Sequence, residues 1–227
     1  MQTDEIKAFV RSQGADLVGI ASADDFEDVP GYKPKDLMPQ AKTVIIFGKK
    51  MLKGFVEGKR GRPVAWGCTH LNIKLDEIAY EVGSHLEEAN YKALPVFFVY
   101  LTFLDPKDQK SFDSILTAPW FGYVPAAAKA GLGEIGLNHL LITPKFGPRM
   151  RLMAVITNAP FHADEPTNSG LCPGTECSLC IEACPVGAFS ADGTLDKMKC
   201  HRQTDAHQLV LGYSSCAICV DACPVGK

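Results

Sequence analysis

The sequence predicts a mixed α/β (α+β) domain followed by a small cysteine-rich domain. Segments typical of helices alternate with segments typical of buried strands over residues 1–160. Eight of the nine cysteines lie between Cys172 and Cys223. A stretch rich in proline and polar residues, 158–170, separates the two regions and is typical of a connector. We therefore expect an α/β domain over residues 1–160 and a second domain over residues 161–227.

The composition excludes several classes of protein. With 227 residues, of which 46% are hydrophobic and 22% charged, the chain is globular and neither disordered nor fibrous. A net charge of −3 supplies no general positive field for nucleic acid or anionic lipid. The longest apolar stretches, 43–48 and 94–104, are shorter than the ~20 residues that cross a bilayer. We expect no nucleic-acid or membrane partner, and the acidic first residues, without signal-peptide features, predict a cytoplasmic protein.

The first elements follow from capping and hydrophobic pattern. Thr3 is a suitable N-cap for a helix that ends at Gly14 and begins with two acidic residues. Residues 16–21 are apolar and predict a strand. The run 43–47, rich in β-branched side chains, predicts a second, buried strand.

The later elements alternate in the same way. Residues 71–90 carry apolar side chains at helical spacing and predict the longest helix. Pro95 follows it, and we expect a third strand over 96–103. A further helix is predicted over 124–130, and further strands over 140–143 and 152–157.

The cysteine-rich region contains the pattern C-x2-C-x3-C-P-V-G twice, starting at Cys177 and at Cys216. Such spacing supplies thiolates to [4Fe–4S] clusters, and in two-cluster ferredoxins the cysteine before proline ligates the other cluster. Four ligands then complete each cluster, with none left over in this region. Cluster 1 takes Cys172, Cys177, Cys180 and Cys223, and cluster 2 takes Cys184, Cys200, Cys216 and Cys219.

Two other uses of these cysteines are alternatives to cluster ligation. Structural zinc also uses C-x2-C pairs but accounts poorly for the two C-P pairs. Disulfides are disfavoured in a reducing compartment. Cys68 stands apart from the others and is predicted to be a small buried thiol.

A glycine-rich segment matches the pattern G-x-G-x-x-G at Gly131, Gly133 and Gly136. In a dinucleotide site this pattern follows a strand and precedes an acidic residue by about 20 positions. Here it follows a predicted helix, and the downstream region carries Arg149 and Arg151 instead. The glycines therefore indicate either a tight turn after a helix or a loop for another cofactor.

The segment 128–148, which reads A-K-A-G-L-G-E-I-G-L-N-H-L-L-I-T-P-K-F-G-P, resembles the epoxyqueuosine reductases and reductive dehalogenases, as does the order of the cysteines. Segments 17–21 and 37–46 resemble the opening strands of that family. The resemblance implies a nitroreductase-like α/β domain that cradles a corrinoid (cobalamin). It also implies a ferredoxin-like domain whose two [4Fe–4S] clusters pass electrons to cobalt. FMN, common in nitroreductase-like domains, is the less favoured alternative cofactor.

The same resemblance implies roles for individual residues. The glycine loop would bring a corrinoid close to the backbone, and Asn138 and His139 would hydrogen-bond it. The family's catalytic Asp, about a dozen residues before this loop, has no counterpart here, and Asp113 is the nearest acid upstream. Tyr123 is the best nearby proton donor, with aromatic packing as its alternative role. Arg149 and Arg151 would hold a carboxylate or a corrinoid phosphate, with charges on a solvated strand face as the alternative.

Two functions are consistent with these observations. The first is a corrinoid-dependent reductase of a small organic substrate, served by an electron donor protein of the ferredoxin or flavodoxin type. The second is an electron-transfer protein that delivers electrons to a partner enzyme or corrinoid protein. Convergence of five side chains on one large apolar cavity would favour the reductase. These are Trp66, His70, Trp120, Tyr123 and Asn138.

Overall fold

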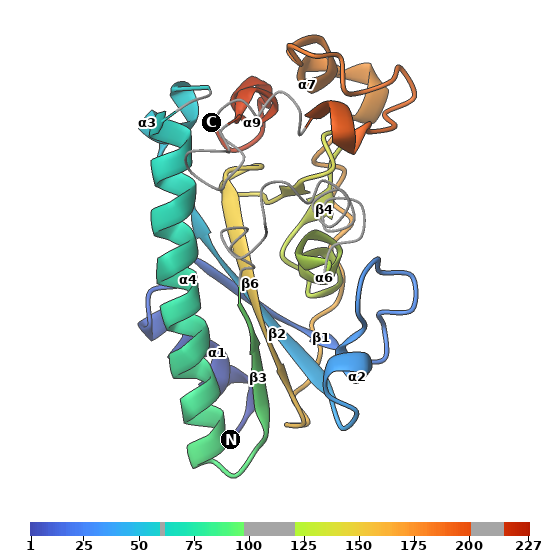
Figure 1. Ribbon diagram of the computed structural model, residues 1–227. Helices are drawn as coiled ribbons and strands as arrows, with labels where there is room; N and C mark the ends of the chain where they lie inside the picture. Colours follow the sequence, from blue (N-terminus) through green and yellow to red (C-terminus); the bar gives the residue numbers. More distant parts are fainter. Residues whose placement is uncertain (60–61, 98–120, 201–215) are drawn as a thin grey trace, which may run out of the picture.

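The computed structural model describes residues 1–59, 62–97, 121–200 and 216–227 (Figure 1). Its centre is a four-stranded sheet in which each pair of neighbouring strands is antiparallel. The strands follow the order β1 (Leu17–Ser22), β2 (Thr43–Lys50), β6 (Met150–Thr157) and β3 (Ala93–Val96). A second, two-stranded sheet consists of β4 (Glu134–Ile135) and β5 (Leu141–Ile142).

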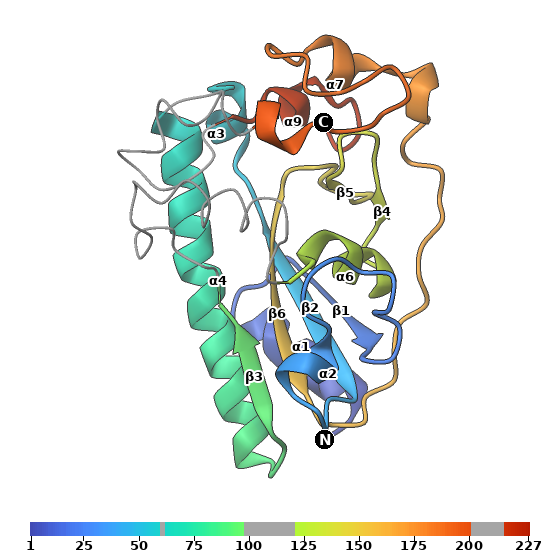
Figure 2. The ribbon, with the colours of Figure 1, turned by 45° about the vertical axis from the view of Figure 1, so that its right-hand side comes forward.

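Helices cover both faces of the sheet and build the cysteine-rich end. The helices of the α/β part are α1 (Thr3–Ser12), α2 (Pro34–Leu37), α3 (Lys53–Glu57), α4 (Arg62–Glu88) and α6 (Tyr123–Lys129). The cysteine-rich part contains the short helices η2 (Gly174–Glu176), α7 (Leu179–Glu182) and α9 (Ile218–Ala222). In both views α7 and α9 lie at the end of the sheet opposite the N-terminus (Figures 1 and 2).

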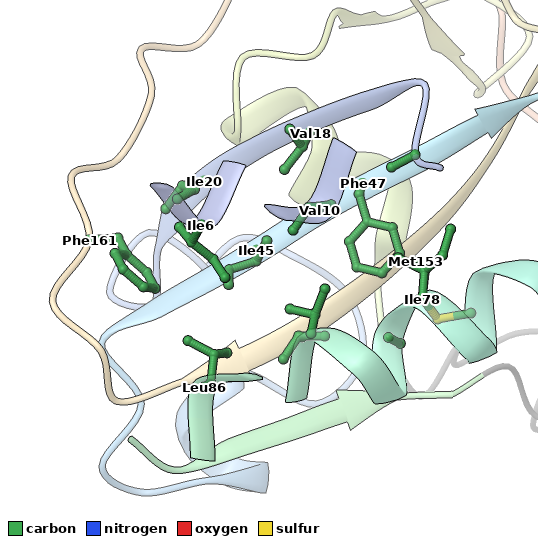
Figure 3. Packing of buried hydrophobic residues seen from close by; sticks show 14 of the residues in the cluster. Ile6, Val10, Val18, Ile20, Ile45, Phe47, Ile78, Leu86, Met153 and Phe161 are labelled. Atoms are coloured by element: carbon green, nitrogen blue, oxygen red, sulfur yellow. The ribbon is translucent and has the colours of Figure 1, made fainter. Parts of the chain in front are cut away.

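The strands bury alternate side chains on opposite faces of the sheet, as a period of two requires. On one face, Ile45 and Phe47 of β2 join the apolar faces of α1 and α4 (Figure 3). On the other face, Val44 and Ile46 pack with α6 and the segment around α2. All four side chains are fully buried. The sheet is therefore the middle layer of three, and its two cores fix the position of everything attached to its ends.

Three predicted elements differ from the structure. Gln2, not Thr3, is the N-cap of α1, because the Thr3 hydroxyl accepts a hydrogen bond from the His162 amide at 2.9 Å. Helix α4 begins at residue 62, nine residues before the predicted start. Strand β3 spans 93–96 and includes Pro95, which is tolerated because β3 is an edge strand of the described sheet.

The remaining predicted elements agree with the structure to within a few residues, except that 98–103 of the third strand lies outside the described residues. Among the described residues, no helix is long and apolar enough to cross a membrane.

The connector returns along the side of the sheet to the cysteine-rich end (Figure 2). Phe161 is buried in the core of α1 and α4. The Asp164 carboxylate forms an ion pair with Lys7 and accepts a hydrogen bond from the Ile20 amide at 2.8 Å. The first residues of the predicted second domain thus pack on the α/β layer, and the boundary at residue 160 stays a prediction.

Candidate iron–sulfur site

One cavity brings together the four cysteines predicted for cluster 1. Cys172, Cys177, Cys180 and Cys223 all line it, although they come from two motifs more than 35 residues apart. The cavity is small, with a volume of about 20 Å³. Leu137, Asn138 and Ile142 from the β4–β5 region complete its wall.

Electrostatic effects on the thiol pKa values also connect these four cysteines. Burial raises the pKa of Cys180, and the thiolates of Cys172 and Cys223 raise it further. Burial likewise raises the pKa of Cys223, with further contributions from Cys172 and Cys177. Coulombic effects of this size fall off with distance, so these four thiols are near neighbours.

The four cysteines predicted for cluster 2 form a second neighbourhood. Burial raises the pKa of Cys200, and Cys216 and Cys184 add to the effect. Burial also raises the pKa of Cys219 to about 12, with contributions from the other three thiols and from Cys180. Cys180 therefore links the two neighbourhoods, consistent with the packing of α7 against α9.

The α/β part holds the second neighbourhood through a small apolar core. Val56 of α3 and Cys68 of α4 are buried together with Ala217 and Val220, and Cys219 packs against them. Cys68 is thus a buried thiol, as predicted, and lies in the same apolar cluster as a predicted ligand. Within the described residues, no three His, Cys, Asp or Glu side chains are arranged to hold a single metal ion.

A seam of close backbone contacts holds the last motif against the sheet. Gly147, at a φ of +54°, lies so close to the Val225 carbonyl that a Cβ would stand 1.9 Å from its oxygen. The Arg149 guanidinium donates to the carbonyls of Met51 at 3.1 Å and Gly226 at 2.7 Å. Arg149 therefore fixes the chain beside Cys223 instead of pointing into solvent.

A second cavity adjoins this seam. It lies between α3, α9 and the last residues of the sequence, and its volume is about 210 Å³. Its wall combines apolar and charged side chains and includes Cys223.

The three predicted cofactor-binding glycines lie against the protein's own atoms. A Cβ at Gly131 would stand 2.5 Å from the Glu165 carbonyl oxygen, and one at Gly133 would stand 2.2 Å from that of Ile142. Gly136 lies against the Ile142 side chain. Close packing accounts for these glycines, and the loop forms no open cradle for a corrinoid among the described residues. Its role in binding one stays a prediction.

Asn138 and His139 also face the cysteine-rich part. The buried Asn138 accepts a hydrogen bond from the Leu140 amide at 3.2 Å and lines the cavity of cluster 1. A ring nitrogen of His139 lies 2.8 Å from the Gly193 carbonyl oxygen, and the ring stacks on Phe189. The structure therefore gives both residues contacts that need no corrinoid.

Tyr123 lies between the two cores of the sheet. Its hydroxyl donates to the Val96 carbonyl at 2.8 Å, and its ring packs edge-on against Phe121. Burial raises its pKa well above the usual value, so the phenol stays neutral at physiological pH. This position gives Tyr123 a packing role, and its action as a proton donor stays a prediction.

Of the side chains proposed to mark a substrate cavity, the four that the structure describes do not line one cavity together, and only Asn138 lines the cavity of cluster 1. Trp66 and His70 are exposed on α4, and neither they nor Tyr123 line either cavity. Trp120 lies outside the described residues, as does Asp113, the nearest upstream acid.

Comparison with known proteins gives the site its context. No protein-family model matches the chain. The chain is 32% identical to the tetrachloroethene reductive dehalogenase of Dehalobacter restrictus over 184 residues, which are 78% of this chain and 28% of that protein. It is 32% identical to the epoxyqueuosine reductase of Lactococcus garvieae over 231 aligned positions, which are 87% of this chain and 59% of that protein.

The chain is homologous to the reductive dehalogenases and epoxyqueuosine reductases. The homology covers most of the chain, which is short relative to both groups and spans less than two thirds of either relative. That family uses [4Fe–4S] clusters and cobalamin, and the eight cysteines of the C-terminal region are consistent with two clusters.

Solved structures confirm the mixed α/β fold. A catabolic reductive dehalogenase superposes with a TM-score of 0.75 at 21% identity, covering 98% of this chain and 31% of that one. The epoxyqueuosine reductase of Streptococcus thermophilus gives a TM-score of 0.65 at 22% identity, covering 98% and 65%.

One set of contacts at the site was not predicted from the sequence: the hydrogen bonds between the glycine loop and Cys172. Glu134 and Leu137, inside the glycine loop, hydrogen-bond to Cys172. The sequence carried a weak signal for them, because the loop matched a cofactor pattern without the strand that a dinucleotide site requires.

Proposed function

We propose that this chain is an iron–sulfur redox protein that relays electrons through two [4Fe–4S] clusters within a reductase of the dehalogenase and epoxyqueuosine reductase type. The observation that carries the proposal is that Cys223 of the second motif lines one cavity with Cys172, Cys177 and Cys180 of the first. Two-cluster ferredoxins require this exchange, because each proline-preceding cysteine joins the other motif's cluster.

The donor set fits a cluster better than it fits zinc. Four thiols surround a cavity in the first neighbourhood, whereas a structural zinc draws four sulfurs to about 2.3 Å from one point. Backbone amides add support, since the Ala188 amide donates to the Cys184 sulfur at 3.4 Å. Such N–H groups stabilise the negative charge of a cluster and help set its potential.

The two clusters would form a short relay. Helix α7, which carries Cys180, packs against α9, which carries Cys219, and this packing supports a short path between the clusters. We propose that a donor protein of the ferredoxin or flavodoxin type supplies the electrons. The expected acceptor is a corrinoid that reduces a small organic substrate, and homology to enzymes of that chemistry supports it.

A specific observation favours the second candidate, an electron carrier for a separate partner. The glycine loop, Asn138 and His139 pack on the cysteine-rich part, so the residues first assigned to the corrinoid serve the cluster region. These contacts favour delivery of electrons to a separate partner over chemistry at a corrinoid held by this chain.

An anaerobic titration of the reconstituted protein with cob(II)alamin separates the two candidates. Iron and sulfide analysis first establishes whether the protein holds about eight irons. Stoichiometric change of the cobalt EPR signal supports the corrinoid reductase. A full complement of iron with an unchanged cobalt signal supports the carrier, and absence of iron–sulfur clusters contradicts both.

A further inference from the structure

The glycine loop, residues 131–139, reaches the first cysteine of the cluster-1 set through a carboxylate. Glu134 Oε1 accepts a hydrogen bond from the Cys172 amide at 2.6 Å. Its Oε2 accepts one from the Gly170 amide at 3.0 Å. One side chain of β4 thus fixes the backbone on the approach to Cys172, which lies 38 residues away in sequence.

The same loop reaches the sulfur of that cysteine. The Leu137 amide donates to Cys172 Sγ at 3.4 Å, and the Leu137 side chain packs closely against Gly193. His139 adds its contact with the Gly193 carbonyl. Leu137 and His139 therefore both fix the loop against the cysteine-rich part, and the Leu137 backbone amide points at a predicted cluster ligand.

Cys172 needs such support more than the other cysteines do. Four residues separate it from Cys177, where the usual two-cluster pattern has two, so its own motif holds it less tightly. In contrast, Cys184 of the second neighbourhood receives its amide from Ala188, four residues along its own segment. Cys172 therefore takes from the α/β part a contact that Cys184 obtains from its own segment.

Resting on the two-cluster function proposed above, we propose that Glu134 is a positioning residue for cluster 1. It holds Cys172 so that the Leu137 N–H donates to the cysteine sulfur. An N–H dipole directed at a ligand sulfur stabilises the charge that the cluster gains on reduction. The glycine loop is then part of the electron relay, and the glycines allow it to approach this closely.

The chain offers a matched control for charge. Glu176 lies between Cys172 and Cys177, is exposed, and has no hydrogen bond in the part of the chain that the structure describes. Glu134→Gln and Glu176→Gln each remove one negative charge near the same cysteine. The first also replaces an acceptor oxygen with an NH₂ group that cannot accept from a backbone amide.

The experiment uses the full chain, reconstituted anaerobically and reduced, with ¹⁵N-labelled leucine. Pulsed EPR should detect a ¹⁵N coupling to a cluster that disappears in Leu137→Ile, which keeps the N–H but removes the label. Glu134→Gln should weaken or abolish this coupling. It should also shift the EPR spectrum toward that of Cys180→Ala, with the cluster-2 signal retained, while Glu176→Gln resembles the wild type.

The outcomes separate failure of the two-cluster function from failure of the positioning role of Glu134. If the wild-type chain assembles no pair of clusters, the proposed function fails. If it assembles both clusters but shows no coupling from Leu137, or if Glu134→Gln matches Glu176→Gln, the positioning role of Glu134 is wrong. Should Glu134→Gln fail to fold, absence of the Leu137 coupling from the labelled wild-type spectrum still overturns the proposal.

Discussion

The α/β part and the cysteine-rich part of this molecule bury very different amounts of apolar side chain. Strands β2 and β6 alone bury eight apolar residues, shared between the cores on the two faces of the sheet: Val44, Ile45, Ile46, Phe47, Met153, Ala154, Val155 and Ile156. Beyond residue 170, the buried apolar side chains among the described residues, free cysteines aside, are Ala188, Ala217 and Val220. Helices α7 and α9 have four and five residues, too few to be stable alone. Burial therefore stabilises one part, whereas the other part would rely on the proposed cluster ligation.

Removal of iron tests this difference with the largest expected effect. Chelation should abolish the structure around α7 and α9 because little apolar burial remains there, while β2 and β6 stay folded. Hydrogen exchange measures both parts in one experiment. Amides of 172–200 should lose protection and those of β6 should keep it. Equal loss in both parts would show that the α/β part also depends on the metal.

Loss of one ligand should divide the cysteine-rich part further. Cys180→Ala should remove cluster 1 and leave about four of the eight irons, because Cys180 is assigned to that cluster alone. Iron analysis and EPR measure the result. Cys68→Ala is the matched control, since Cys68 belongs to neither set, and it should leave the iron content unchanged. An unaltered spectrum in Cys180→Ala would refute the ligand assignment.

A substitution in the apolar core should lower the unfolding free energy and leave the iron content unchanged. Phe47 is fully buried between β2 and the helices α1 and α4, so Phe47→Ala should cost about 3–5 kcal/mol of unfolding free energy. Denaturant titration followed by circular dichroism measures the loss. Iron content per folded chain should stay that of the wild type, and a selective loss of one cluster would contradict the separation of the two parts.

Substitution of Gly147 should disturb the close backbone contacts between the α/β part and the last cysteine motif. A methyl group there would collide with the Val225 carbonyl at a backbone angle that disfavours L-residues, so Gly147→Ala should displace the last motif and weaken cluster 1. Partial loss of iron on gel filtration measures the effect. Gly54→Ala, where a methyl group meets nothing within 4 Å, should retain all of its iron. If both variants retained the same amount of iron, the close contacts at Gly147 would not be needed for cluster 1.

A surface ion pair gives the smallest expected effect. The hydrogen bond from Lys129 holds the pKa of Asp28 below its usual 3.8, with the pair 2.8 Å apart. A carboxyl with a lowered pKa contributes stability above pH 3.8, and the contribution is lost as pH falls through its folded-state pKa. Asp28→Asn should therefore lower the urea midpoint slightly near neutral pH and not below that pKa. A larger difference in acid would give the wrong sign.

Much of the α/β part could be predicted from local pattern because its signals are local. The β-branched run 43–47 predicted β2, and the spacing from Leu71 onward predicted most of α4. The first turns of α4 were missed because Gly67 interrupts the pattern, although it packs directly against the Phe55 ring. Pro95 was interpreted as a strand boundary, since an edge strand cannot be recognised before the sheet is known.

The candidate site divides in the same way. Counting cysteines predicted two sets of four; the first set lines one cavity, and the assignment of all eight as cluster ligands stays a prediction. The contact between Glu134 and Cys172 could not be predicted, because it joins positions 38 residues apart through one carboxylate and leaves no periodic signal. The same holds for His139, whose contact with Gly193 exists only after folding.

The central claim is that eight thiols hold two four-iron clusters. Mössbauer spectroscopy of the chain reconstituted with ⁵⁷Fe, together with iron, zinc and acid-labile sulfide analysis, tests it most directly. The account predicts about eight irons and eight sulfides per chain, with all iron in [4Fe–4S] form. Tightly bound zinc without labile sulfide, or iron for a single cluster, would contradict it.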